Sequence, residues 1–285
     1  MEKLIFSADL HGNLEQYEKI LNYARQQNVD IIAFGGDLTP KDSGLRTPKG
    51  QRDFLENQLF PLFKNFRQHS DIPILLIMGN DDFISNRDVF VQGQKPFGYQ
   101  MIDVTPYVTK SGYSIVGYNY IPSTPFKHKC WERRDREQDI DFSDREDTRL
   151  EGVISQGDEL VAYNLNEALS LPSIEADLET LTKGMDTSKL ILISHSPPYD
   201  TVCDFCVMKK HVGSKALKAF IENKQPYLTL HGHIHETVDL TGAFIEKIGT
   251  SSVVTVGNDH RPRDPYIIEA ELNDTPACQR LQIQS

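Results

Sequence analysis

The feature that most constrains the fold of this chain is a short apolar run that recurs along it and each time ends abruptly in polar residues. Runs that are rich in Ile, Leu and Val and apolar on both faces are typical of strands buried in a sheet that helices cover. They occupy residues Leu4–Ala8, Asp30–Gly35, Ile72–Gly79, Lys189–Ser194 and Tyr227–Leu230.

Helical patterns separate these runs. Asn13 is a suitable N-cap for a helix whose apolar residues are spaced by three and four positions. A second helix is predicted across residues 54–66, where Pro61 should kink or divide it. Ser214 is expected to cap a third helix, and Pro226 follows its end. This alternation of strand and helix predicts an α/β sheet.

Two regions depart from that alternation. Residues 104–121 and 237–272 show apolar residues at every second position, which predicts antiparallel strands. Between them, residues 127–151 are crowded with charge of both signs and contain Trp131. We expect a solvated insertion or surface helix there, with a cap over a cleft as the alternative. No repeat or Gly/Ser linker divides the chain, so residues 1–285 are expected to form one domain, with 122–152 as the insertion or cap.

Polar side chains follow each of the five runs. Ligands bind outside the carboxyl ends of strands in open α/β sheets, so we expect these side chains to meet. The set contains carboxylates, an amide and imidazoles but no thiolate, which suits Mn, Fe or Zn rather than a thiolate-rich zinc site. In chain order the residues are Asp9, His11, Asp37, Asn80, His195, His231, His233 and His235.

These residues carry a resemblance to a known family. The ordered motifs resemble those of the calcineurin-like metallophosphoesterases, and the match spans residues 9–235. They are Asp9-Leu10-His11, Gly36-Asp37, Gly79-Asn80-Asp81-Asp82, Ser194-His195 and Gly232-His233-Ile234-His235. Around residues 195–199 and 211–214 the chain is similar to the Icc-related group of small phosphoesterases. The resemblance implies an α/β fold, a four-layer α/β/β/α sandwich of two mixed sheets flanked by helices.

The resemblance also implies a centre of two divalent metal ions. One ion would be held by Asp9, His11, Asp37 and His235, and the other by Asp37, Asn80, His195 and His233. A carboxylate that bridges both ions would offset their mutual repulsion. His233 and His235 stand two residues apart, so an extended segment would point both imidazoles the same way. His231 shares that parity, but we expect an ordinary structural role for it.

The implied activity is hydrolysis of phosphate esters by attack of a metal-bound hydroxide. Two divalent ions and two ligating aspartates leave a charge that a hydroxide and a diester monoanion would neutralise. Small phosphodiesters are therefore the expected substrates. A nuclease or a phosphomonoesterase would use the same site, and a non-catalytic metal-binding scaffold is the further alternative.

Asn80 and Asp81 are the predicted catalytic residues. The family usually has His where this chain has Asp81, and that His stabilises the transition state or protonates the leaving group. An ionised aspartate cannot donate a proton, so Asp81 is expected to orient water or a ligand, with solvent protonating the leaving group. A purely structural turn residue is the alternative.

Charge and hydropathy limit the partners. The formal net charge is -11, which disfavours strong nucleic-acid binding and leaves a small-molecule phosphate ester as the expected partner. No run approaches the roughly 18 apolar residues of a spanning helix, and the first apolar run is too short for a signal peptide, so no membrane association is expected. Four cysteines in a chain of this length fit a reduced cytoplasmic protein, and the oligomeric state stays open.

Three further motifs are expected to be structural rather than functional. Cys203-x-x-Cys206 with His211 lacks the second pair that a zinc site needs. Gly213-Ser214 could present backbone N–H groups to a phosphate, but plain helix capping explains it equally well. Residues 260–263, His-Arg-Pro-Arg, are expected to be a solvated basic spot.

Overall fold

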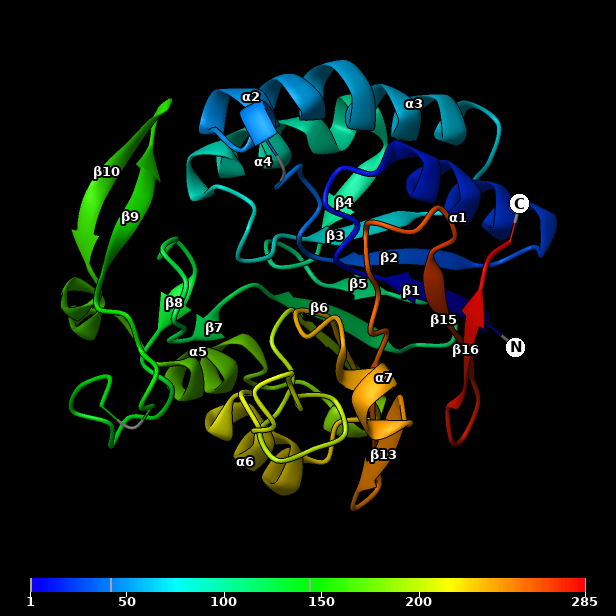
Figure 1. The fold of residues 1–285 in the computed structure, drawn as a ribbon. Helices are drawn as coiled ribbons and strands as arrows, with labels where there is room; N and C mark the ends of the chain where they lie inside the picture. Colours follow the sequence, from blue (N-terminus) through cyan, green and yellow to red (C-terminus); the bar gives the residue numbers. More distant parts are fainter. Residues whose placement is uncertain (1, 42, 144, 285) are drawn as a thin grey trace.

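The computed structural model describes residues 2–41, 43–143 and 145–284, and two six-stranded sheets dominate it (Figure 1). The first sheet has the spatial order β16 (Ala277–Gln282), β15 (Tyr266–Leu272), β1 (Glu2–Ser7), β2 (Ile31–Gly35), β3 (Ile74–Ile77), β4 (Tyr99–Met101). The second has the order β13 (Ile245–Ile248), β14 (Ser251–Thr255), β12 (Leu228–His231), β11 (Leu190–Ser194), β6 (Ser114–Tyr118), β5 (Tyr107–Val108).

Both sheets are mixed. In the first, β1 to β4 run parallel, while β15 lies antiparallel to β1 and to β16. In the second, β6, β11, β12 and β14 run parallel, while β5 and β13 are antiparallel edge strands. The five apolar runs supply β1, β2, β3, β11 and β12, all of which lie in the parallel parts of the sheets.

Each of these runs is apolar on both faces because each face meets a different layer. Leu4 and Phe6 of β1 pack between the two sheets, whereas Ile5 points to the outer side, where helices cover the sheet. In β11, Ile191 and Ile193 likewise face the other sheet. Alternate side chains on a strand point to opposite faces, so a strand between two buried layers needs apolar residues at every position.

Helices form the two outer layers. The first sheet is covered by α1 (Leu14–Gln26), α2 (Pro48–Phe54), α3 (Phe60–Gln68) and α4 (Arg87–Phe97), and the second by α5 (Ile174–Leu181) and α6 (Lys215–Lys224) (Figure 1). Short 3₁₀ turns lie at Ser43–Leu45, Ile84–Asn86, Leu165–Ser170 and Thr187–Lys189. The predicted four-layer α/β/β/α sandwich of two mixed sheets is confirmed. No helix among the described residues combines the length and apolar character that crossing a bilayer requires.

The three predicted helices are confirmed, and so are the two predicted N-caps. The Asn13 side chain accepts a hydrogen bond from the backbone N–H of Gln16, and the Ser214 hydroxyl accepts one from that of Leu217. Pro61 divides the second helix as predicted, because a π-helical turn, Leu55–Leu59, separates α2 from α3. Proline has no N–H to bond the carbonyl one turn earlier, so the regular helix restarts around it.

The predicted antiparallel strands are confirmed in part, because residues 256–265 form a loop and β7 (Ile121–Pro122) pairs in parallel. Strands β5 and β6 pair around the turn at residues 109–113, and β13 pairs with β14. Residues Thr237–Thr241, however, form the short helix α7 instead of a strand. Gly242 ends that helix in a left-handed conformation with φ of 72°, and the strand alternation begins only at Ile245.

The charged segment 122–152 is built differently from a surface helix. Its described residues contain no helix, and the short strands β7 (Ile121–Pro122) and β8 (Glu132–Arg133) pair in parallel. Strands β9 (Glu151–Gln156) and β10 (Glu159–Asn164) then form a hairpin at the edge of the molecule (Figure 1). Trp131 is only 1% exposed and packs in the core beneath α1 to α4, so the segment is tied to the body rather than fully solvated.

Candidate metal centre

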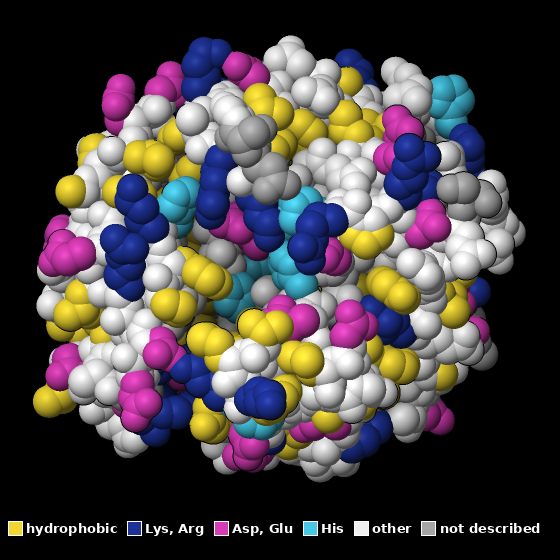
Figure 2. Space-filling view, in the orientation of Figure 1, with side chains coloured by type: hydrophobic (Ala, Val, Ile, Leu, Met, Phe, Trp, Pro, Cys, Tyr) yellow, Lys and Arg dark blue, Asp and Glu magenta, His cyan; other side chains and the backbone are white. Residues whose placement is uncertain are grey.

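The carboxyl ends of the central strands bring the predicted ligands into one hollow. Asp9 and His11 follow β1, Asp37 follows β2, Asn80 follows β3, His195 follows β11, and His233 and His235 follow β12. Figure 2 shows histidine side chains gathered in this hollow, with Lys and Arg side chains along one rim. Strand order in two facing sheets therefore collects residues that are more than 200 positions apart.

The backbone at these residues is unusual. Asp9, His11, Asp37 and His233 have φ values of 60°, 42°, 52° and 71°. This left-handed region costs an L-residue roughly 1–2 kcal/mol. Such conformations persist where the surrounding structure over-determines them, and they cluster at functional sites. The strained turns are thus a second mark of a site, independent of the residue types.

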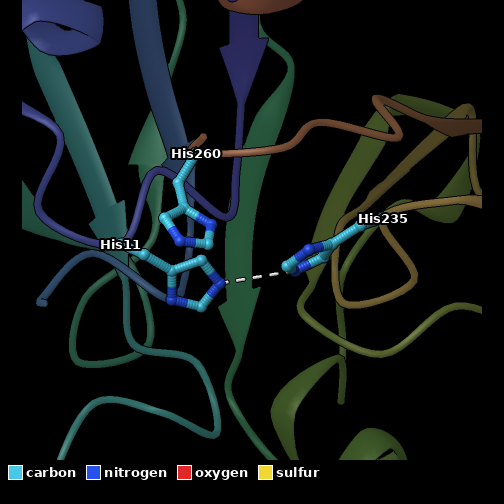
Figure 3. Close-up of side chains that lie close together, drawn as sticks. All are labelled: His11, His235 and His260. Carbon is cyan, nitrogen blue, oxygen red and sulfur yellow. Dashed lines mark hydrogen bonds between the residues drawn. The ribbon is translucent and has the colours of Figure 1, made fainter. Parts of the chain in front are cut away.

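Four side chains form the tighter half of the hollow. His11 Nε2 lies 3.3 Å from His235 Nε2 (Figure 3). His11 Nε2 also lies 3.6 Å from Asp37 Oδ2, and His235 Nε2 lies 3.6 Å from Asp9 Oδ1. One atom from each of the four residues lies within 4.8 Å of the others. Two ligands about 2.0–2.2 Å from one cation are separated by about 3–4 Å, so this donor set fits a divalent ion.

The other half is organised around His195. Its Nε2 lies 3.0 Å from Asn80 Oδ1 and 3.5 Å from Asp37 Oδ1, and its ring centroid lies 5.2 Å from that of His233. The Nδ1 of His195 donates to the carbonyl of Gly35 over 2.8 Å, which directs Nε2 into the hollow. Asp37 thus turns Oδ2 toward His11 and Oδ1 toward His195, the arrangement that a bridging carboxylate needs.

Burial sets the protonation of the imidazoles. It lowers the pKa of His11 and of His233 to about 3 each, so both are neutral and keep a lone pair for a cation. Burial also opposes a charge on His195, but the neighbouring Asp37 carboxylate raises the pKa of His195 to about 9. Although burial favours the neutral acid, the nearby histidines hold the pKa of Asp37 well below its usual value. The anions of the hollow attract positive charge, which protons supply when no metal does.

Gly79 permits the close packing of the two halves. A Cβ at this position would lie 2.3 Å from the backbone nitrogen and from Oδ1 of Asp37, and 2.7 Å from the ring of His195. Any side chain here would push the shared carboxylate away from His195. The residue before Asn80 is therefore glycine for a steric reason.

Asp81 lies at the rim of the hollow. Its backbone N–H donates to Asp37 Oδ1 over 2.7 Å, and its own Oδ1 accepts from Arg46 over 2.8 Å. Its Oδ2 lies 3.9 Å from His11 Nδ1. Burial and the charge of Asp37 raise the pKa of Asp81. The carboxylate is thus held by an arginine next to the predicted ligands.

Asp82 is a supporting residue that sequence reasoning missed. Its fully buried carboxylate accepts from the backbone N–H groups of Leu38, Thr39 and Gly79 and from the Thr39 hydroxyl, at 2.6–3.1 Å. It therefore ties the loop after β2 to the loop after β3 and places Asp37 against Asn80. Burial, followed by the charge of Asp37, raises the pKa of Asp82 to about 7. Its place in the Gly-Asn-Asp-Asp motif was the available signal.

His260 and Lys41 also enter the hollow, and neither was predicted. The His260 ring lies 4.9 Å from that of His11, and His260, His11 and His235 could together hold an ion (Figure 3). The expectation of a solvated spot at residues 260–263 is therefore wrong for His260, although Arg261 and Arg263 are exposed. Asn13 draws the loop in by donating to the His260 carbonyl over 2.7 Å. Lys41 Nζ lies 2.9 Å from His11 Nε2.

The other motifs have structural surroundings. His231 Nδ1 lies 3.1 Å from the carbonyls of Ser194 and Ser196, and its Nε2 lies 2.9 Å from the Thr229 hydroxyl, so both nitrogens are used within the protein. Cys203 and Cys206 are free and buried. The helix start at Gly213-Ser214 already holds the Asp135 carboxylate, which accepts from the Ser214 hydroxyl and the Lys215 N–H, so the phosphate alternative there is wrong.

Comparisons with known proteins agree with this picture. The family model described as calcineurin-like phosphoesterase matches residues 2–237. The uncharacterized protein MJ1162 of Methanocaldococcus jannaschii is 34% identical over 88 residues, which are 30% of this chain and only 36% of that protein.

Solved structures share the fold. The protein TT1561 of Thermus thermophilus has a TM-score of 0.58 at 17% identity and covers 99% of both chains. A dimetal phosphatase from Danio rerio has a TM-score of 0.56 at 11% identity, over 99% of this chain and 98% of its own.

Proposed function

The chain belongs to the calcineurin-like phosphoesterases, a family of metal-dependent phosphoester hydrolases, and from that premise we propose that it hydrolyses small phosphodiesters at a centre of two divalent cations. The observation that carries the proposal is the position of Asp37. Its two carboxylate oxygens face two separate groups of imidazoles, at 3.6 Å from His11 and 3.5 Å from His195. A single carboxylate between two ligand sets is the arrangement of a two-metal site.

We assign the ligands as the sequence suggests. Asp9, His11, Asp37 and His235 would hold one cation, and Asp37, Asn80, His195 and His233 the other. The donors are oxygen and imidazole nitrogen, which suit Mn, Fe or Zn. When bound, the two cations supply Lewis acidity and make water a nucleophile at neutral pH.

The side chains around the ligands have their own tasks. Asp82 keeps the loops of Asp37 and Asn80 in register through its hydrogen bonds to Leu38 and Gly79. Asp81 holds Arg46 at the rim, where the guanidinium can attract and orient a phosphate. Asp81 thus acts by positioning a cation and water, and leaving-group protonation falls to solvent. This favours substrates with acidic alcohols as leaving groups.

Two considerations support small phosphodiesters, the first against monoesters and the second against long nucleic acids. Two divalent cations and two ligating aspartates leave a net positive charge that one nucleophilic hydroxide and one diester monoanion neutralise. The ion pair of Asp81 with Arg46 adds no net charge. The whole chain carries -11, which disfavours a long nucleic acid because each phosphate contacted normally calls for a Lys or Arg. A non-catalytic scaffold would not need all seven donors, and the chain has each of them.

One observation favours a phosphomonoesterase as the second candidate. Lys41 brings an additional positive charge to within 2.9 Å of His11 Nε2, and this charge would suit a monoester dianion. The same ligands would serve both reactions, so the preference has to be measured.

The test is an assay of purified protein supplemented with Mn²⁺, with p-nitrophenyl phosphate and bis(p-nitrophenyl) phosphate as paired substrates. We expect a higher kcat/KM for the diester and a loss of at least about 10³-fold in His195→Ala. His69→Ala is the matched control, because His69 is exposed on the far end of α3. Activity that survives both His195→Ala and chelation would refute the two-metal centre, and a higher kcat/KM for the monoester would refute the diester preference.

A further inference from the structure

A cavity opens beside the candidate metal centre on the side of His233. Its volume is about 610 Å³, and His233 and Ile234 form part of its lining. Small-molecule sites enclose about 300–1,000 Å³, so the cavity can take an organic group larger than a phosphate. Because His233, a proposed metal ligand, lies in its wall, whatever group fills the cavity lies next to the candidate centre.

Two segments that are distant in sequence form the walls. One is the insertion, through residues 122–126 and 145–148, and the other is the loop between β11 and α6, which carries residues 206–212. Three large hydrophobic side chains on these walls are exposed, Phe126 by 51%, Val207 by 68% and Met208 by 53%. The Phe126 ring stands edge-on to that of His233 at 6.3 Å. Exposed apolar groups gathered at one cavity point to a ligand that covers them.

Several charged groups of the lining have partners within the protein. Lys210 forms an ion pair with Asp147. Arg145 donates to the carbonyl of Val212 over 2.8 Å and lies 3.6 Å from Asp135. Lys210, Asp147 and Arg145 are therefore occupied within the protein, and Phe126, Val207 and Met208 leave apolar and aromatic surface for a ligand.

Another part of the rim of the hollow has the other character. Lys41 lies beside His11, and Arg46 pairs with Asp81, and neither of these cations lines the cavity. Figure 2 shows the contrast, with Lys and Arg side chains on one side of the histidines and hydrophobic side chains on another. A ligand that matches both sides carries an anion at one end and a flat apolar group at the other.

We propose that this cavity binds an aromatic ester group of the substrate, which makes Phe126, Val207 and Met208 specificity-determining residues for aryl-bearing phosphodiesters. The proposal rests on the diesterase function proposed above. Aromatic rings pack edge-to-face or offset against one another, and Phe126, His233 and Tyr199 offer ring surfaces for such contacts. Dialkyl phosphates would bind the centre but leave the cavity empty.

The experiment measures binding and turnover separately in the Mn²⁺-loaded protein. Calorimetry gives the Kd of diphenyl phosphate and of dimethyl phosphate, and either ester group of each can enter the cavity. Turnover is followed with bis(p-nitrophenyl) phosphate and methyl p-nitrophenyl phosphate. The cavity variant combines Phe126→Ala, Val207→Ala and Met208→Ala. The matched control removes three exposed hydrophobic side chains that lie outside the cavity, through Ile140→Ala, Leu160→Ala and Leu240→Ala.

Wild type and the control variant should bind diphenyl phosphate at least about tenfold more tightly than dimethyl phosphate. The cavity variant should lose most of that preference while its Kd for dimethyl phosphate stays unchanged. An equal preference in the wild type and the cavity variant overturns the proposal. The wild type could instead form a dimer that the cavity variant does not form, while the preference for diphenyl phosphate is the same in both. That result would assign the surface to a second copy of the chain and would also overturn the proposal.

The two proposals fail in different ways. If wild type hydrolyses neither diester but binds diphenyl phosphate with a preference that the cavity variant loses, the diesterase function is wrong and the cavity assignment stands. If both diesters are hydrolysed and the cavity variant keeps the wild-type preference, the function stands and the cavity assignment is wrong.

Discussion

Removing the ammonium of Lys129 while its partner carboxylate remains should destabilise the protein by about 3–5 kcal/mol at pH 8. Lys129 Nζ lies 3.0 Å from Glu132 Oε1 and donates to the Thr124 carbonyl over 2.8 Å, and both charged side chains are at most 1% exposed. In Lys129→Met the Glu132 carboxylate keeps only the donors of Thr124. A buried charge without its counter-ion is the costly state.

The loss should depend on pH in a defined direction. Burial raises the pKa of Glu132 from 4.5 to about 7. A carboxyl whose pKa is higher in the folded state contributes stability that is complete below the unfolded pKa and is lost as the pH rises through the folded pKa. The charge of Lys129 lowers this pKa, so Lys129→Met should raise it beyond 7.

The size of the pH effect follows from this shift. The free energy of unfolding falls by about 1.4 kcal/mol for each pH unit over which Glu132 is protonated in the folded state but ionised in the unfolded state. Between pH 5.5 and 8, only the folded state keeps the proton over about 1.5 units in wild type, and over a wider range of up to about 2.5 units in the variant. The destabilisation by Lys129→Met should therefore be larger at pH 8 than at pH 5.5, by up to about 1.4 kcal/mol.

Urea and thermal unfolding, followed by the fluorescence of the single tryptophan, Trp131, measure these differences. At about 2 °C per kcal/mol, the melting temperature should fall by about 6–10 °C at pH 8. Adding Glu132→Gln to Lys129→Met should restore part of the stability and remove the excess pH dependence. The exposed Lys127→Met is the control and should change stability by less than about 0.5 kcal/mol. A loss from Lys129→Met that is equal at both pH values would refute the reasoning.

Three other predictions concern the metal centre. Asp82→Asn places an amide NH₂ against backbone donors, so it should lower the free energy of unfolding by about 2–4 kcal/mol and weaken Mn²⁺ binding at least about tenfold. An unchanged Mn²⁺ affinity in calorimetry would contradict the positioning role of Asp82. Arg46→Ala should lower kcat/KM for diesters about tenfold, while Lys49→Ala, which breaks an exposed ion pair, should leave it unchanged. Equal kcat/KM values in the two variants would show that Arg46 does not contact the substrate phosphate. Mn²⁺ at about 100 times its Kd should add about 2.7 kcal/mol of stability, and a melting temperature indifferent to chelation would count against metal binding.

Much of the fold and of the ligand set was predictable because it is encoded locally. A strand between two apolar layers needs apolar residues on both faces, so β1, β2, β3, β11 and β12 are visible as uninterrupted runs. The carboxyl ends of such strands meet at one edge, so the polar residues after them form a candidate site even without distances. The assignment of individual ligands to each cation remains a prediction.

The surroundings of that site were not predictable, because long-range contacts create them. His260 reaches His11 because side chains about 245 positions earlier, Asn13 and Gln16, donate to backbone carbonyls of its loop. Lys129 reads as one more charge in a charged segment, and only the fold shows that it is buried against Glu132. A charged side chain can be solvated or buried with a partner, and its sequence neighbours do not distinguish the two states.

The sequence by itself thus determined the layers, the strand ends and the chemical type of the candidate centre, since each depends on local periodicity and residue type. Only the tertiary structure decided which side of that centre is cationic and which is apolar. Lys41 and Arg46 on one side, and Phe126, Val207 and Met208 on the other, come from loops whose sequences have no period. The path of such loops depends on the packing of the whole chain, and that packing sets what the hollow can bind.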